Sequence, residues 1–127
     1  MRATPVLFYT QGGETPVRQW LDELRRHDRR AFAKCVVRIQ ELSQYGHELR
    51  RPAADLLRDG IHELRARQGH VQYRILYFFH GRWAAVLAHA IVKEGWAVPE
   101  ADIERALHRK VRFLQDPRAH ALVATLS

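Results

Sequence analysis

The fold of this chain is decided by residues 60–93, GIHELRARQGHVQYRILYFFHGRWAAVLAHAIVK, where apolar and polar residues alternate with a period of two. The alternation predicts an antiparallel meander of three strands, Ile61 to Arg67, His70 to Phe79 and Arg82 to Val92. The pairs Gln68-Gly69 and His80-Gly81 are the expected two-residue turns. One face of these strands is almost wholly apolar, so we expect helices to pack on it.

Helical patterns lie on both sides of the meander. After a short strand, Val6 to Tyr9, a helix is predicted from Pro16 to about Arg26, and a second one is predicted from its cap at Asp28 to Gly46. In the basic connection Leu49 to Asp59, a short helical turn is expected at Ala53 to Leu57. A last helix is predicted from Pro99 to Asp116, with an apolar side made by Ile103, Ala106, Leu107, Val111 and Leu114.

These elements predict one α+β domain over residues 1–127. It is a twisted antiparallel sheet with two N-terminal helices and a C-terminal helix packed on it. Trp20 and the stripe that begins at Phe32 are expected in the core, together with Tyr73 and Tyr77 on the apolar face of the sheet.

The opposite face of the meander is polar. Two-residue turns would place Glu63 opposite Arg74 and Arg65 opposite Gln72, and the next turn would place Arg74 opposite Leu87 and Gln72 opposite His89. This face then collects Glu63, Arg65, Arg67, His70, Gln72, Arg74, His89 and Lys93. Burying so much unpaired charge is costly, so the face is expected to be an open groove. A three-residue loop at residues 80–82 would instead move His89 and Lys93 to the other face.

Arginine and lysine side chains on such a face suit a ribose-phosphate backbone. Arg67, His70 and Gln72 are candidates for RNA contacts. Glu63 either forms a purely structural ion pair with Arg74 or orients it toward a phosphate. His89 is a candidate base, although a histidine among apolar neighbours often has only a structural role.

Composition narrows the class of protein. The chain has 127 residues and a formal net charge of +7, and residues 60–93 hold five Lys or Arg residues against one acidic residue. This suits an anionic partner such as nucleic acid. The histidines lack metal-ligand spacing, and Cys35, the single cysteine, lies on the buried stripe of a predicted helix, so neither a metal site nor a cysteine nucleophile is expected. No signal peptide or membrane-spanning run is apparent, which predicts a cytoplasmic protein without membrane contact.

Four motifs follow one another in an order that carries a family resemblance. They are Pro16-Val17-Arg18-Gln19-Trp20-Leu21, Leu57-Arg58-Asp59-Gly60-Ile61-His62-Glu63-Leu64-Arg65, Tyr73-Arg74-Ile75-Leu76-Tyr77-Phe78 and Leu87-Ala88-His89-Ala90-Ile91-Val92-Lys93. In this order they resemble the RelE/ParE toxin superfamily, and within it the phage-related HigB-like branch. The chain departs from that branch at Ile91, where the pattern has Phe, and at Glu94-Gly95, which replace a second Lys and a polar residue.

The resemblance implies a RelE-like fold and the toxin of a type II toxin-antitoxin system. The implied activity is a metal-independent mRNA endonuclease that works on the ribosome, needs no cofactor and is silenced by a helix-turn-helix antitoxin. Arg65, Arg74 and Lys93 match family positions. Arg65 and Arg74 would bind the phosphate, Lys93 would stabilise the leaving or attacking oxygen, and His89 would serve as the base.

Two other functions stay open at this point. A ParE-like toxin would use the same fold to inhibit a protein such as DNA gyrase without cleaving RNA. Alternatively, the helix pair at residues 16–45 would act as a helix-turn-helix in a non-catalytic nucleic-acid-binding protein. The cation-rich face favours the nuclease over the protein inhibitor, which has no need of a phosphate-shaped groove. Against the helix-turn-helix, neither helix shows an obvious recognition surface, and the connection Arg26-His27-Asp28 lacks the usual Gly.

Overall fold

The computed structural model describes residues 3–95 and 97–124. The elements, in chain order, are β1 (Val6–Tyr9), α1 (Pro16–His27), α2 (Arg29–Tyr45), η1 (Gly46–Glu48), β2 (Ala54–Arg58), β3 (Ile61–Gln68), β4 (Val71–His80), β5 (Ala84–Lys93), α3 (Glu100–Gln115), η2 (Pro117–His120) and β6 (Ala121–Val123). The strands form one sheet in the order β2-β3-β4-β5-β1-β6, in which β1 runs parallel to β5 and all other neighbours are antiparallel. The predicted α+β class is confirmed.

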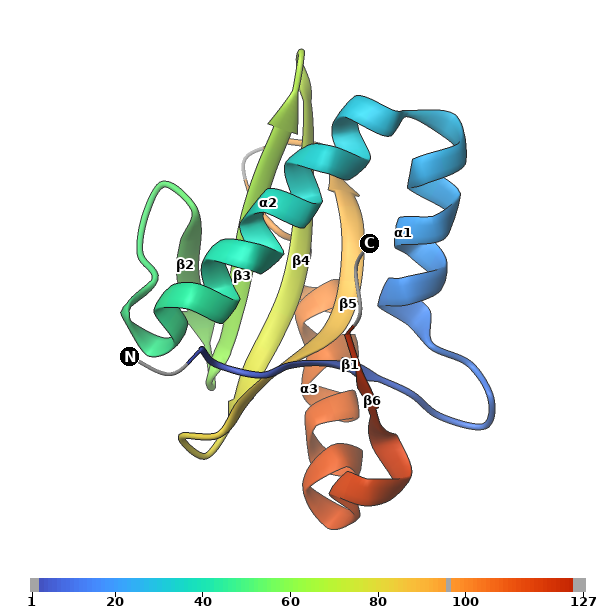
Figure 1. Cartoon of the computed structure of the whole chain (residues 1–127), viewed down its shortest axis with the longest axis vertical. Coiled ribbons are helices and arrows are strands. Elements are labelled where there is room, and N and C mark those ends of the chain that lie inside the picture. The colour runs from blue at the N-terminus through green and yellow to red at the C-terminus, as the bar shows by residue number, and fades with distance from the viewer. Residues whose placement is uncertain (1–2, 96, 125–127) are drawn as a thin grey trace.

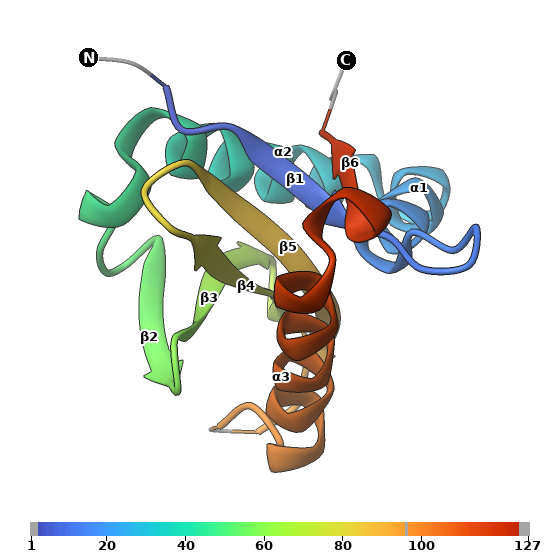
Figure 2. The same cartoon turned by 90° about the horizontal axis from the view of Figure 1, so that it is seen from below.

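The helices lie on both faces of this sheet (Figures 1 and 2). Helices α1 and α2 cover one face, where their apolar side chains join those of β3, β4 and β5 in a core that includes Leu21, Leu42 and Tyr77. Helix α3 covers part of the other face, where Ile103, Ala106 and Phe113 pack on Ile61, Leu76, Phe78, Val86 and Ala88. The expectation that helices pack on the apolar face and leave the polar face open is wrong for α3, because the polar face ends in an apolar area that this helix buries.

The predicted helix boundaries follow from local chemistry. Pro16 occupies the first turn of α1, where a missing N–H costs nothing. The Asp28 side chain caps α2 by accepting a hydrogen bond from the backbone N–H of Ala31 at 3.0 Å, and Gly46 ends that helix with φ of 55°. In α3 the predicted apolar side is partly wrong: Val111 and Leu114 are exposed, and Phe113 is the buried residue near its end.

Two strands were not expected. The segment predicted as a helical turn at residues 53–57 forms β2, which pairs with β3 through the turn Asp59-Gly60. Both turn residues have positive φ, 51° and 78°, as a tight hairpin requires, and Asp and Gly adopt this conformation more readily than other residues. At the opposite edge β6 pairs with β1.

The strand register differs from the expected one. The turn between β3 and β4 is Gly69-His70, so Arg65 lies opposite Arg74 and Arg67 lies opposite Gln72. The predicted pairs of Glu63 with Arg74 and of Arg65 with Gln72 are therefore wrong. The shift is two residues, however, and a shift of two leaves every side chain on its predicted face.

The β4–β5 hairpin contains two irregularities that cancel. Its loop has three residues, Gly81 to Trp83, which turns Val86 to the α3 face, opposite to the predicted one. A bulge at Ala88 then restores the alternation, so that His89 lies opposite Leu76 and Lys93 lies opposite Gln72. The predicted pairs of Arg74 with Leu87 and of Gln72 with His89 are wrong, yet His89 and Lys93 are on the predicted face.

Candidate functional site

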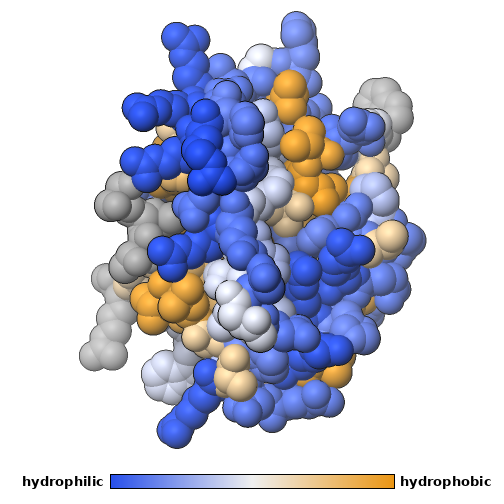
Figure 3. All heavy atoms as spheres, turned by 90° about the vertical axis from the view of Figure 1, so that its right-hand side faces the viewer, coloured by the Kyte–Doolittle hydropathy of each residue, from blue (hydrophilic) through white to orange (hydrophobic). Residues whose placement is uncertain are grey.

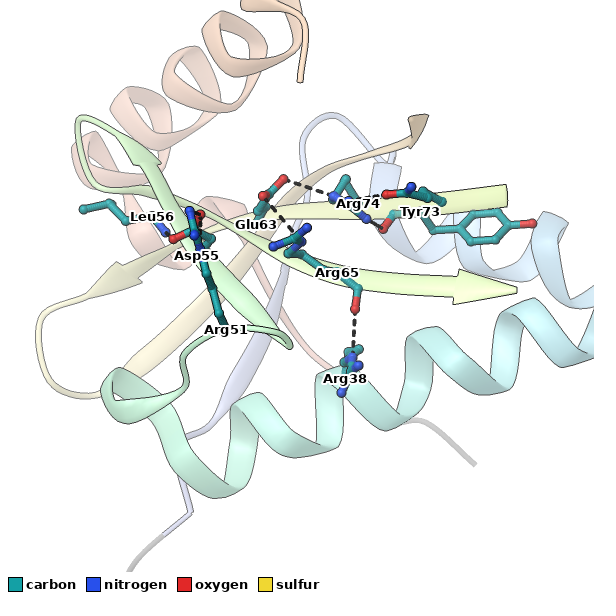
Figure 4. Close-up of polar contacts among 9 residues, drawn as sticks. Arg38, Arg51, Asp55, Leu56, Glu63, Arg65, Tyr73 and Arg74 are labelled. Carbon is teal, nitrogen blue, oxygen red and sulfur yellow. Dashed lines mark hydrogen bonds and ion pairs between the residues drawn. The ribbon is translucent and has the colours of Figure 1, made fainter. Parts of the chain in front are cut away.

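A cleft of about 300 Å³ lies where the polar face of β3 and β4 extends beyond α3. It is lined by Arg38, Pro52, Arg65, Ala66, Arg67, Gln72 and Arg74, and we call it the cationic cleft. The paired residues of β2 and β3 end at Ala54, opposite Leu64. Beyond this pair the Arg65 N–H donates to the Ala53 carbonyl oxygen at 2.8 Å, and Arg38 of α2 contacts the edge of β3. The Arg38 Nε donates a hydrogen bond to the Arg65 carbonyl oxygen at 2.7 Å (Figure 4).

The floor of the cationic cleft is a buried ion pair. The Arg74 side chain is 2% exposed, and its Nε lies 3.2 Å from Oε1 of Glu63, itself buried. This contact lacks the alignment of a hydrogen bond. Arg74 also donates to the Tyr73 carbonyl oxygen at 3.0 Å (Figure 4) and to Oε1 of Gln72 at 2.6 Å. Its guanidinium is thus occupied mainly with holding Glu63 and Gln72 in place.

The accessible cations stand around this floor. The Arg65 side chain is 33% exposed, and its Nε lies 4.0 Å from Oε2 of Glu63. Lys93 lies on the same face, opposite Gln72 in the neighbouring strand. Burial lowers the pKa of Lys93, and the positive charges of Arg74 and Arg65 lower it further, while Glu63 opposes the shift. A lysine in this setting gives up its proton more readily than a solvated one.

The predicted RNA-contacting residues lie at one end of the cleft. Arg67 is exposed beside the β3–β4 turn, and its Nε donates to the Gly69 carbonyl oxygen at 2.8 Å. His70 is exposed within that turn, and Gln72 is half-buried in the cleft lining. The structure therefore brings Glu63, Arg65, Arg67, Gln72, Arg74 and Lys93 together on one surface, with His70 at its end.

His89 is not part of this group. It shares the face, but α3 covers it: its Nε2 lies 2.7 Å from Oδ1 of Asp102, and its Nδ1 lies 3.4 Å from a guanidinium nitrogen of Arg109. Burial lowers the pKa of His89, and Arg109 adds to this while Asp102 opposes it. The four residues from His89 to Lys93 correspond to about 13 Å along a strand, too far for both to act on one phosphate.

Sequence reasoning missed three residues of this region. Arg38 stands between two buried positions of α2, Cys35 and Ile39, and nothing in its spacing signals a contact with β3. Asp102 and Arg109 hold His89 from α3, and they were missed because the helix was expected on the opposite face.

Two further properties of the described residues concern metals and membranes. Residues 3–95 and 97–124 contain no group of three or more His, Cys, Asp or Glu side chains placed to hold a metal ion. Within the same ranges, none of the helices has the length and apolar character needed to span a bilayer.

A protein-family comparison assigns the chain. The family described as Phage derived protein Gp49-like (DUF891) matches residues 19–111, well over half of the sequence. The chain belongs to this family. The Gp49-like family is RelE-type and toxin-like, and the matched residues run from α1 into α3, so they include the whole cationic cleft. No curated protein matches the chain.

Proposed function

We propose that this Gp49-like protein is the toxin of a type II toxin-antitoxin system and that it cleaves mRNA on the ribosome without a metal ion. The cationic cleft carries the proposal. Arg65 and Arg67 line a preorganised floor, Lys93 lies opposite Gln72 on the same face, and such fixed charges stabilise a phosphate whose negative charge grows during reaction. The toxin-like family and the net charge of +7 support the same function.

The reaction that suits this cleft is internal transesterification of RNA. The ribose 2′-oxygen forms a bond to the adjacent phosphorus, the bond from phosphorus to the 5′-oxygen breaks, and a 2′,3′-cyclic phosphate results. The 2′-hydroxyl proton leaves to water in the open cleft, and the departing 5′-oxygen takes up a proton. Positioning and charge stabilisation are enough for this chemistry when cations are held in place.

The proposed role of each residue follows from how far its side chain is exposed. Arg65 contacts the phosphate oxygens, and Lys93, whose pKa is lowered, donates the proton to the 5′-oxygen. Arg74 is a positioning residue because it is buried and holds Glu63 and Gln72. His89 is too far away to be the base and instead fastens β5 to α3.

The proposed partners are mRNA on the ribosome and a cognate helix-turn-helix antitoxin, in the cytoplasm. An antitoxin can silence this activity by covering the cationic cleft or by placing acidic side chains in it, since the cleft depends on uncompensated positive charge.

The test compares Arg65→Ala and Lys93→Ala with Arg112→Ala, an exposed cation on α3. Each of the first two variants should reduce mRNA cleavage about a hundredfold, the scale of losing one preorganised donor, and should relieve growth arrest. Arg112→Ala should cut at the wild-type rate. The measurements are primer extension on total mRNA and growth after induction. Arrest with intact mRNA and gyrase-bound DNA breaks would refute the proposal and favour the ParE-like alternative.

A further inference from the structure

A second and larger pocket, of about 570 Å³, lies on the α2 face of the sheet. Its walls come from the segment after α2, from β2, and from the neighbouring ends of β3 and β4. The lining residues that matter here are His47, Arg50, Arg51, Leu56, His62 and Phe79. We propose that this pocket binds one nucleotide of single-stranded RNA next to the site of cleavage, an inference that rests on the proposed function for the identity of the strand.

The pocket presents flat rings. The imidazole of His47 stacks on Phe79 with ring centroids 3.6 Å apart and planes at 20°. His62 stacks on Tyr77 at 5.1 Å, with planes at 19°. His47 is exposed, and the apolar side chain of Leu56 is exposed beside it. An unstacked nucleobase of any identity can stack on such rings and contact such apolar surfaces.

The pocket also presents a charge for phosphate. Arg50 is exposed, and its Nη1 donates to the carbonyl oxygens of His47 at 2.6 Å and of Leu49 at 3.3 Å. These bonds orient the guanidinium while using one nitrogen of a group with five N–H donors. Arg51 is paired with Asp55 at 2.7 Å, so Arg50 is the better phosphate ligand of the two. A base surface next to an oriented guanidinium matches a nucleotide.

The pocket adjoins the cationic cleft through neighbouring residues of the chain. Asp55 lies opposite Glu63 in the sheet, and Figure 4 shows the side chain of Arg51, which precedes β2, beside Asp55 on the strand next to Glu63 and Arg65. Pro52 lines the cleft while its neighbour Arg51 lines the pocket, so these two residues form the ridge between them. An RNA chain whose phosphate lies at Arg65 can therefore cross this ridge and place the base of its next nucleotide in the pocket.

The first experiment uses nucleoside 5′-monophosphates as probes and the imidazole proton signals of the full-length protein as readout, assigned with His47→Gln and His62→Gln. We expect saturable shifts of both histidine signals. Arg50→Gln should weaken binding at least fivefold. Arg29→Gln is the matched control, since Arg29 is an exposed cation where α1 meets α2, and the side of the molecule that carries α1 is largely hydrophilic (Figure 3). Unmoved histidine signals, or equal weakening in the control, would overturn the proposal.

Further measurements distinguish nucleotide binding from protein docking and from RNA cleavage. If a short polyglutamate peptide shifts the same signals at lower concentration than the nucleotides do, the pocket is a protein-docking site and the proposal fails. If the protein cleaves RNA and Arg50→Gln changes neither the rate nor the choice of cleavage positions, the pocket proposal fails alone. If nucleotides bind as expected but no RNA is cut, nucleotide binding stands and the proposed function fails.

Discussion

Removing the carboxylate of Glu63 should strongly destabilise the fold. In Glu63→Ala the guanidinium of Arg74, which is 2% exposed, loses the charge 3.2 Å away that compensates it. Breaking one side of a buried ion pair costs about 3–5 kcal/mol. Arg74 keeps its bonds to Tyr73 and Gln72, so we expect the lower limit, about 3 kcal/mol. For 127 residues the unfolding entropy is about 0.27 kcal/mol/K, which makes the loss about 11 °C in Tm.

Urea unfolding and thermal melting followed by circular dichroism measure this change. Arg65→Ala is the matched control, because Arg65 lies 4.0 Å from the same carboxylate but is one-third exposed, and its loss should cost less than about 1 kcal/mol. The double variant Glu63→Leu with Arg74→Met should recover most of the stability, since it removes both charges. By the same scaling, 1 kcal/mol of unfolding free energy corresponds to about 4 °C in Tm. If the Tm of Glu63→Ala is within about 2 °C of the Tm of Arg65→Ala, then Arg74 is not a buried charge that depends on Glu63.

Two further predictions concern titration and reactivity. Burial holds the pKa of His62 and of His89 below the ordinary value of 6.5, so each group takes up its proton at a lower pH in the folded protein than in the unfolded chain. The stability that these groups contribute should be complete above pH 6.5 and should fall as the pH drops toward their folded pKa values. Urea unfolding at about pH 7.5 and about pH 5.5 measures this fall in the free energy of unfolding. The fall should be smaller in a His62→Gln, His89→Asn variant than in the wild type, and an equal fall would contradict the prediction. Burial raises the pKa of Cys35 to about 12, so a thiol reagent at about pH 8 should label it only after denaturant is added, and rapid labelling of the folded protein would show that α2 opens.

The helix ends and the faces of the strands were predictable from the sequence, because local interactions set both. Caps and breakers such as Pro16, Asp28 and Gly46 act within a turn of the chain, so the helix ends were predictable. Strand alternation has a period of two, and it placed Arg65, Arg74 and Lys93 on one face although the turns were assigned wrongly. The predicted face was right because both errors in register are even numbers of residues. The β3–β4 pairing is shifted by two residues, and in the β4–β5 hairpin the bulge at Ala88 offsets the three-residue loop, so the side chains that follow return to the predicted face.

Only the tertiary structure decided how that face is used. Strand pairing and helix docking are set by the packing of residues far apart in the sequence, which no local pattern encodes. Helix α3 covers the apolar end of the polar face, buries His89 against Asp102 and leaves the other end open as the cationic cleft. The same packing buries Arg74 and brings Arg38 to the edge of β3. The sequence therefore determines which charges share the face, and long-range packing determines which of them meet solvent.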